Sequence, residues 1–99
     1  MRAVVILTEA ALDLEEGRKF YELQESGLGE YFIDSLLADI ASLRLFHGVH
    51  RLQHGFHRML SARFPFGIYY RERETETWVF AVLDLRRHPN WIRQELGAR

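Results

Sequence analysis

The chain carries two hydrophobic patterns, one typical of strands and one typical of helices. Residues 3–7 (AVVIL) are continuously apolar and mostly β-branched, which predicts a strand buried on both faces. Along residues 9–26, small and apolar side chains recur at helical spacing, which predicts an amphipathic helix. The predicted buried stripe contains Ala10, Leu14, Gly17 and Tyr21.

Polar residues and glycines mark the limits of this first helix. Thr8 is a favourable N-cap, and Glu9 lies in the first turn, where the helix dipole favours an anion. Gly17 in the middle costs up to ~1 kcal/mol relative to alanine, which a close helix–helix contact would explain. Gly27 is a candidate for the left-handed position after the helix.

A second helix is predicted over residues 30–46, where aliphatic side chains keep the 3.6-residue period. Its expected core face contains Phe32, Ile33, Leu36, Leu37, Ile40 and Leu43. Because the connection to the first helix is short, we expect the two helices to form an antiparallel hairpin.

The remainder of the chain predicts strands. After a polar loop over 47–55, three strands are expected, at residues 56–61, 64–72 and 77–84. One face of the middle strand carries Phe64, Phe66, Ile68 and Tyr70. The last strand is apolar on both faces and is expected to lie inside the sheet. Pro89 then favours the start of a short final helix over 90–99.

In the order β-α-α-β-β-β-α, these elements predict a single α+β domain over residues 1–99. We expect a helical hairpin packed on a small, mainly antiparallel four-stranded sheet. The chain has no cysteine, which excludes a disulfide framework and fits a cytoplasmic location. Its first apolar run is too short to cross a membrane, so no membrane partner is expected.

The net charge of −1 hides an uneven distribution. Residues 1–40 contain nine acidic and three basic residues, whereas residues 41–99 contain ten basic and five acidic residues. The second half therefore either presents a basic surface to an acidic partner or a nucleic acid, or is neutralised by the acidic half within one fold.

Basic residues gather directly after the last predicted strand. Arg86, Arg87 and His88 follow Asp84 closely, and two guanidinium groups at such a place can bind a carboxylate or phosphate bidentately. We therefore expect both arginines to point outward together. The alternative is that they pair with Asp84 or with the acidic first helix, although surface pairs contribute at most ~1 kcal/mol.

A ribonuclease site is a second interpretation of the same region. It needs groups that titrate near neutral pH and cations that bind phosphate. The candidate residues are His57, Arg58, Arg86, Arg87 and His88.

The loop histidines have the spacing of a metal site but lack its other requirements. His47, His50, His54 and His57 are separated by three, four and three residues. Glycines interrupt any helix there, and no cysteine completes a ligand set, so neither a metal nor a cofactor is expected. Among the aromatic residues, Trp91 is the expected exposed anchor for a partner.

Five segments together resemble the RelE/ParE superfamily of toxins from type II toxin–antitoxin modules, and ParE-like members more than RelE. They are EAALDLEEGRKFYE (9–22), GLGEYF (27–32), GFHRML (55–60), RFPFGIYYR (63–71) and VLDLRRHPNWI (82–92). The resemblance implies a cognate antitoxin that wraps the helical hairpin and the sheet. It also implies either gyrase poisoning, as in ParE-like members, or messenger RNA cleavage in the ribosomal A site, as in RelE-like members.

This sequence departs from the ribonuclease branch of that superfamily. Arg86 matches a functional arginine that follows the last strand, but Trp91 or Ile92 stands where a tyrosine is expected. Gly67 replaces a middle-strand arginine. Many ParE-like sequences have histidine in place of Asp84 and an acid four residues later. The resemblance therefore favours binding over catalysis.

The sequence thus predicts a ParE-like, plasmid-stabilisation type of toxin that inhibits growth by binding a target such as DNA gyrase. It is expected to form a hetero-oligomer with its antitoxin and to have no catalytic residues. The residues expected to bind target or antitoxin are Arg58, Arg86, Arg87, His88 and Trp91. The alternatives are a ribosome-dependent messenger RNA endonuclease and a non-toxic nucleic-acid-binding module.

Overall fold

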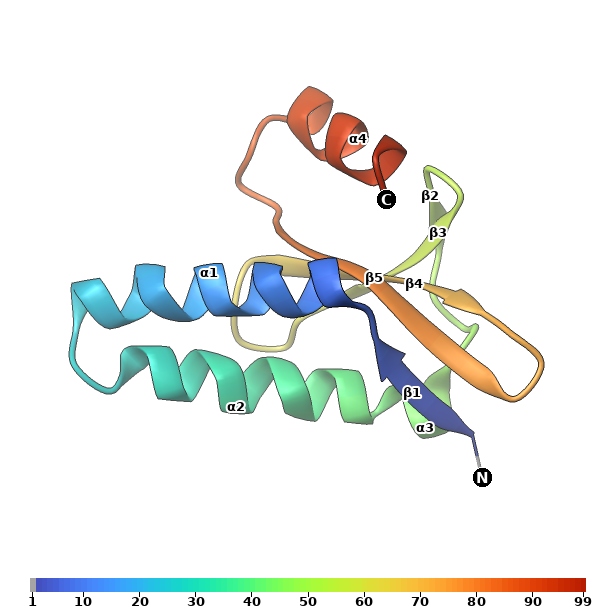
Figure 1. Cartoon of the computed structure of the whole chain (residues 1–99), viewed down its shortest axis with the longest axis horizontal. Coiled ribbons are helices and arrows are strands. Elements are labelled where there is room, and N and C mark those ends of the chain that lie inside the picture. Colours follow the sequence, from blue (N-terminus) through green and yellow to red (C-terminus); the bar gives the residue numbers. More distant parts are fainter. Residues whose placement is uncertain (1) are drawn as a thin grey trace.

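A computed structural model describes residues 2–99, in which two long helices lie side by side on one side of a sheet and a shorter helix lies on the other (Figure 1). The elements in chain order are β1 (Ala3–Ile6), α1 (Thr8–Gln24), α2 (Leu28–Ala41), α3 (Leu43–Phe46), β2 (Leu52–Gln53), β3 (Phe56–Leu60), β4 (Phe66–Glu72), β5 (Glu76–Asp84) and α4 (Pro89–Gly97).

The sheet has the strand order β1-β5-β4-β3-β2. Only the β1–β5 pair is parallel, and the other pairs are antiparallel, which confirms the α+β class and the mainly antiparallel sheet. The predicted number of four strands is wrong, because the sheet described here has five. The helix α3 was likewise expected as part of a single longer helix.

The additional strand β2 belongs to a tight hairpin inside the expected polar loop. Leu52 pairs with His57 and Gln53 pairs with Phe56. His54 and Gly55 between them have positive φ angles of 54° and 84°, as a two-residue turn of type I′ requires. Two paired residues are too few to produce a visible alternation, so the hydrophobic pattern does not reveal this strand.

The first helix begins one residue earlier than its side chains suggest. Leu7 occupies the N-cap position without a side-chain hydrogen bond, and Thr8 is already helical, so the prediction of Thr8 as N-cap is wrong. The Leu7 N–H still donates to the Val79 carbonyl at 3.0 Å, while the Leu7 carbonyl accepts from Ala11. The chain therefore passes from sheet to helix at one residue, which leaves no separate capping position.

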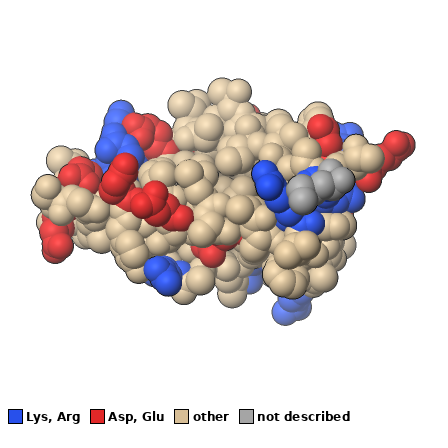
Figure 2. All heavy atoms as spheres, turned by 90° about the horizontal axis from the view of Figure 1, so that it is seen from below, with Lys and Arg blue, Asp and Glu red and all other residues tan. Residues whose placement is uncertain are grey.

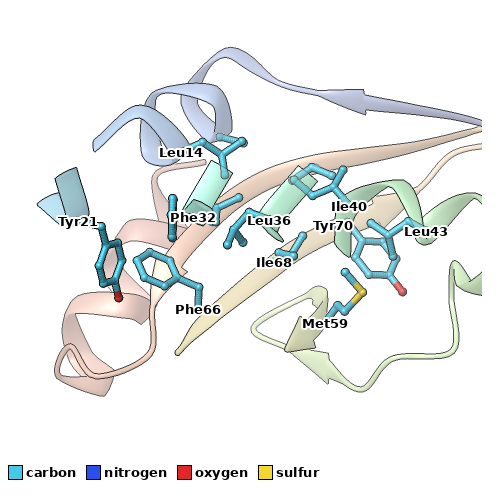
Figure 3. Packing of buried hydrophobic residues seen from close by; sticks show 13 residues of the cluster. Leu14, Tyr21, Phe32, Leu36, Ile40, Leu43, Met59, Phe66, Ile68 and Tyr70 are labelled. Carbon is cyan, nitrogen blue, oxygen red and sulfur yellow. The ribbon is translucent and has the colours of Figure 1, made fainter. Parts of the chain in front are cut away.

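The main core lies between the helical hairpin and the sheet (Figure 3). The buried residues of α1 are Ala10, Leu14, Gly17 and Tyr21, which confirms the predicted stripe. On α2, Phe32, Leu36 and Ile40 are buried, but Leu37 is 42% exposed, contrary to its predicted core position. From the sheet, Phe66, Ile68 and Tyr70 complete the cluster, and Phe64 packs at its edge.

A second, smaller core lies on the opposite face of the sheet. Strand β5 contributes Phe80, Ala81 and Leu83 to it, while Val79 and Val82 point into the main core. Helix α4 covers this face with Ile92 and Leu96. The strand that is apolar on both faces is thus covered on both faces, as its sequence predicts.

The two long helices are in close contact at Gly17. A Cβ atom added there would lie only 2.6 Å from the Cζ of Phe32, so no side chain fits. This contact explains the mid-helix glycine. Gly27 also has the predicted left-handed conformation, with φ of 91°, and its N–H donates to the Glu22 carboxylate at 3.0 Å.

We predict that Gly17→Ala destabilises the protein by about 1–3 kcal/mol, because the new methyl group overpacks the contact with Phe32. In an unconstrained helix the same change stabilises by up to ~1 kcal/mol. Urea unfolding followed by fluorescence measures the difference. Gly97→Ala in α4 is the matched control, since its Cβ meets nothing within 4 Å, and it should not destabilise. Equal effects at both sites would contradict the packing argument.

Candidate functional site

The turn after β5 is organised by Asp84. Its Oδ1 accepts hydrogen bonds from the Arg86 backbone N–H at 2.9 Å and from Arg86 Nε at 3.0 Å, and its Oδ2 accepts from Nη2 at 2.8 Å. Partial burial alone would raise the pKa of Asp84, but these bonds outweigh it and hold the pKa below its usual value. Arg86 is therefore bound to an acid of its own chain, as the alternative interpretation predicts.

Arg87, the second arginine of the pair, contacts a different part of the molecule from Arg86. The guanidinium carbon of Arg87 lies 3.8 Å from the centre of the Trp91 ring, whereas Arg86 reaches back to the Tyr21 hydroxyl at 3.3 Å. The expectation that both guanidinium groups point outward together is wrong, because the Asp84 carboxylate holds one of them. Among residues 2–99, no carboxylate oxygen lies within 4.0 Å of the Arg87 guanidinium.

Each arginine borders its own shallow pocket. Arg86 lies beside an apolar pocket of about 270 Å³ that includes Leu60, Pro65 and Leu85. Arg87 and Trp91 border a pocket of about 330 Å³ between α1, β5 and α4. The second pocket also contains carboxylates, so it offers both charges to a ligand. The carboxylates lining it come from Asp13, Glu16, Asp84 and Glu95.

His88 and Trp91 are tied to helix α4. His88 is the N-cap residue, and its Nδ1 accepts a hydrogen bond from the Asn90 N–H at 3.0 Å. Pro89 occupies the first turn, as predicted. Trp91 is half-buried, because one side packs against the second core while Arg87 covers another part. The expected exposed anchor is thus a stacked arginine–tryptophan pair.

The remaining candidates, His57 and Arg58, point to opposite faces of β3. The ring of His57 stacks on Tyr70 in the main core, with 5.1 Å between ring centres, and its Nδ1–H donates to the His50 carbonyl at 2.7 Å. Arg58 lies on the other face, where its Cδ would be 3.4 Å from a Cβ at Gly67. The structure therefore does not bring the five candidate ribonuclease residues together on one surface.

Gly67 stands where the ribonuclease branch has an arginine, and the space above it is occupied. A Cβ at this position would lie 3.0 Å from Leu85 Cδ2 and 3.1 Å from Tyr69 Cε2. Any larger side chain requires these neighbours to move. The missing arginine is consequently a packing feature of this fold and not an open position in a site.

Two further arginines on the face of Arg58 escaped the sequence analysis. The guanidinium of Arg71 lies 3.9 Å from the centre of the Phe56 ring, and its Nε donates to the Gly55 carbonyl at 3.1 Å. Arg73 lies 4.4 Å above the Trp78 ring. Arg71 lies on β4 and Arg73 in the turn that follows it, but the aromatic partners come from other strands, so only the sheet register reveals the stacks.

Arg99 forms a buried network that the sequence pattern also does not reveal. Its side chain is only 6% exposed, and it donates to both oxygens of Asp13, at 2.7 and 3.0 Å. It also bonds the Phe80 carbonyl and Glu95. Strand β1 ends before Val82, so Asp13 accepts the otherwise unpaired Val82 N–H at 3.0 Å. The network fixes α4 to α1 and β5, and the hydrogen bonds that Arg99 donates to Asp13 raise the pKa of Arg99.

His47 and His50 hold their loop against strand β4. His47 Nδ1–H donates to the Glu72 carboxylate at 2.6 Å, the Gly48 N–H donates to the Tyr70 hydroxyl at 2.9 Å, and that hydroxyl donates to His50 Nδ1. Within residues 2–99, no group of three histidine, aspartate or glutamate side chains is placed to hold a metal ion. No helix in this part of the chain is long and apolar enough to cross a membrane.

Comparison with known proteins finds a solved structure with a similar fold. Among solved structures, the chain is similar to a chain described as "Chromosomal ParDE TA system from P. aeruginosa", with a TM-score of 0.73 and 17% sequence identity. The match covers 86% of this chain and 97% of that chain. No family model and no curated protein matches the sequence. At this identity the similarity shows that the two chains share a fold.

We predict that Asp13→Asn destabilises the protein by about 3 kcal/mol, because it leaves the buried Arg99 guanidinium without its main counter-charge. Denaturant unfolding measures the loss, and Trp91 fluorescence reports whether α4 detaches first. Glu15→Gln is the control, since the Glu15–Arg18 pair is exposed and its loss should leave the midpoint nearly unchanged. Equal shifts in both variants would contradict the proposed role of the network.

We predict that His50 makes the folded state sensitive to mild acid. Burial, and secondarily the nearby His57, lower the pKa of His50 below its usual value of 6.5. The unfolded chain therefore binds the proton more readily, so the stabilisation is complete above pH 6.5 and is lost as the pH falls through the pKa of the folded state. His50→Asn should flatten the decrease in unfolding free energy below pH 6.5, measured by urea titration.

The control for this prediction is His54→Asn. His54 is exposed and has a positive φ that asparagine tolerates, so this variant should retain the pH dependence of the parent chain. An unchanged slope in His50→Asn would contradict the assignment.

Proposed function

We propose that this chain is the toxin of a type II toxin–antitoxin module, of the ParE-like kind associated with plasmid stabilisation. A cognate antitoxin would hold it inactive in a hetero-oligomer, and the released toxin would inhibit growth by binding a target such as DNA gyrase. The observation that carries the proposal is the fold match to a chain of a ParDE system over 86% of this chain.

The arrangement after β5 supports a binding role over RNA cleavage. Of the five candidate ribonuclease residues, Arg86 is engaged with Asp84 and His88 caps a helix. A general base and acid must both reach the scissile phosphate, and here the half-buried His57 stacks on Tyr70 and its Nδ1–H is bonded to the His50 carbonyl. A catalytic constellation would therefore need substantial rearrangement.

We propose that the Arg87–Trp91 pair is the centre of the target-binding surface, together with Arg58 and His88, whereas Arg86 is held by Asp84 and borders a different pocket. Arginine and tryptophan are the residue types that most often dominate binding energy in protein interfaces. Stacking on Trp91 restricts the Arg87 guanidinium before binding, which reduces the entropy that a partner must offset. The donor edges of Arg87 remain available, because no ion pair engages them within residues 2–99.

The antitoxin is proposed to cover the outer face of the helical hairpin. Several large apolar side chains of these two helices are exposed: Leu12, Phe20, Leu23, Tyr31 and Leu37. An amphipathic segment laid along two helices buries such side chains in the manner of helix-in-groove recognition.

One observation favours the ribosome-dependent endonuclease as a second candidate. Arg58, Arg71 and Arg73 lie on the sheet face away from the hairpin, and aromatic rings support two of them. A face of this composition suits RNA phosphates and bases. A plain nucleic-acid-binding module would use the same face, and its affinity for naked nucleic acid would fall steeply with salt.

The discriminating experiment is induced expression of the chain with and without the small gene beside it. We expect growth arrest from the toxin alone, rescue by the neighbour, and a stable complex of the two proteins on co-purification. DNA damage with continuing translation selects gyrase, whereas cleavage within A-site codons selects the endonuclease. Harmless expression, together with no complex, contradicts the toxin proposal.

We predict that Arg87→Ala reduces toxicity at least tenfold, scored as the inducer concentration that halts growth, because it removes the proposed anchor. Arg93→Ala on exposed α4 is the matched control and should remain toxic. Both variants should unfold at the denaturant concentration of the parent, since each residue is exposed. Full toxicity of Arg87→Ala would place the target-binding surface elsewhere.

A further inference from the structure

A cluster of exposed apolar side chains lies beyond the end of α2, outside both cores. Leu45 is 80% exposed, Phe46 56%, Val49 73% and Leu52 66%. Arg44 and Arg51 lie among them in the sequence and are exposed as well. We call these six residues the basic apolar patch. Four large apolar side chains exposed to this degree within residues 45–52 indicate an interaction site.

The backbone that carries the patch is held firmly in place. The bond from His47 to Glu72 and the bonds of Gly48 and His50 with the Tyr70 hydroxyl fix one part of the loop to β4. The β2–β3 hairpin fixes the other part, where the Arg58 N–H donates to the Arg51 carbonyl at 2.9 Å. The apolar side chains are therefore exposed because the polar side of the loop is turned toward the sheet.

The charge of the patch indicates the chemistry of its partner. No carboxylate oxygen within residues 2–99 lies within 4.0 Å of the Arg44 or Arg51 guanidinium groups. The nearest acid of β4, Glu72, is already engaged by His47, Thr77 and Arg2. Figure 2, which views the molecule from the side of α2, shows acidic and basic residues at both ends of this face, with largely uncharged surface between them.

The patch continues the outer face of α2. Leu37 and Ala41 are exposed on that helix, and Leu45 follows at the same four-residue spacing. Ser42 between α2 and α3 has right-handed helical angles, so the chain passes from one helix to the other without an extended linker. A segment lying along α2 can therefore extend onto the patch without a break.

We propose that the basic apolar patch binds an acidic amphipathic segment of the antitoxin, in which Asp or Glu residues flank Leu, Ile or Phe. This inference rests on the proposed function and adds to it a second docking region beyond the helical hairpin. Apolar side chains of the partner would cover Leu45 and Val49, and its carboxylates would pair with Arg44 and Arg51.

Two other occupants fit less well. A second copy of the chain offers the acidic end of the hairpin, but Glu22 there is bonded to the Gly27 and Gly29 N–H groups and Glu15 is bonded to Arg18. An anionic membrane would require a longer amphipathic helix with many basic residues, whereas α3 is one turn long.

The test uses the purified product of the small neighbouring gene as the probe and isothermal titration calorimetry as the measurement. We expect Arg51→Glu, and separately Leu45→Ser combined with Val49→Ser, to weaken binding about tenfold or more, equal to about 1.4 kcal/mol. Arg93→Glu is the charge-matched control and should change the affinity less than twofold. Urea unfolding of each variant verifies that these exposed substitutions leave the fold intact.

The outcomes separate this inference from the proposed function. If the parent chain binds the probe tightly and both patch variants bind equally well, the patch is not a docking region, although the toxin–antitoxin proposal stands. If the parent chain does not bind the probe, both proposals fail. If light scattering shows that the parent chain self-associates and that Arg51→Glu abolishes the self-association, the patch is a contact between two copies of the chain. That result overturns the inference. The inference is also overturned if the parent chain sediments with phosphatidylglycerol vesicles and the patch variants do not.

Discussion

The structure depends on one constraint, which is that β5 is apolar on both faces and must be covered on both. The helical hairpin covers one face, where Val79 and Val82 meet the main core. Helix α4 covers the other, where Phe80 and Leu83 meet Ile92. The chain must therefore reverse around the end of the strand within a few residues. Asp84 and His88 organise that reversal, so the residues at the candidate site serve the fold first.

The same constraint explains why charged groups are buried at the end of α4. A short helix with two buried apolar residues would be held weakly by hydrophobic contact alone. The Arg99–Asp13 bonds add a fixed point between α4 and the hairpin. The Asp13 carboxylate also accepts a hydrogen bond from the Val82 N–H, which β1 does not reach. The position of α4 thus depends on a contact between residues far apart in the sequence. The position of the Arg87–Trp91 pair depends on the same contact.

Local periodicity was sufficient to predict most of the fold and little of the site. The stripe of Ala10, Leu14, Gly17 and Tyr21 follows from helical spacing alone, and the inner position of β5 follows from its apolar residues. The hairpin strand β2 was not predictable, because two residues carry no period.

The candidate site was predicted by residue type, but not by geometry. That Arg86 pairs with Asp84 while Arg87 stacks on Trp91 depends on a turn whose shape no pattern encodes. The arginine stacks on Phe56 and Trp78 depend on register between strands. The anchoring role of His47 and His50 depends on Glu72 and Tyr70, which lie 25 and 20 residues away from them. Contacts of this kind arise only once the sheet has formed.

The parallel pairing of β1 with β5 has a consequence for how the molecule is made. Ala3 is the register partner of Glu76, so the first strand has no neighbour until most of the chain has been synthesised. The helical hairpin is complete long before that, and its apolar stripe then has no sheet to cover it. The β1–β5 pair therefore cannot form before residues 76–79 have been made, and non-local pairing of this kind is slow. A newly made chain passes through an interval in which its helices are formed but its final surfaces do not yet exist.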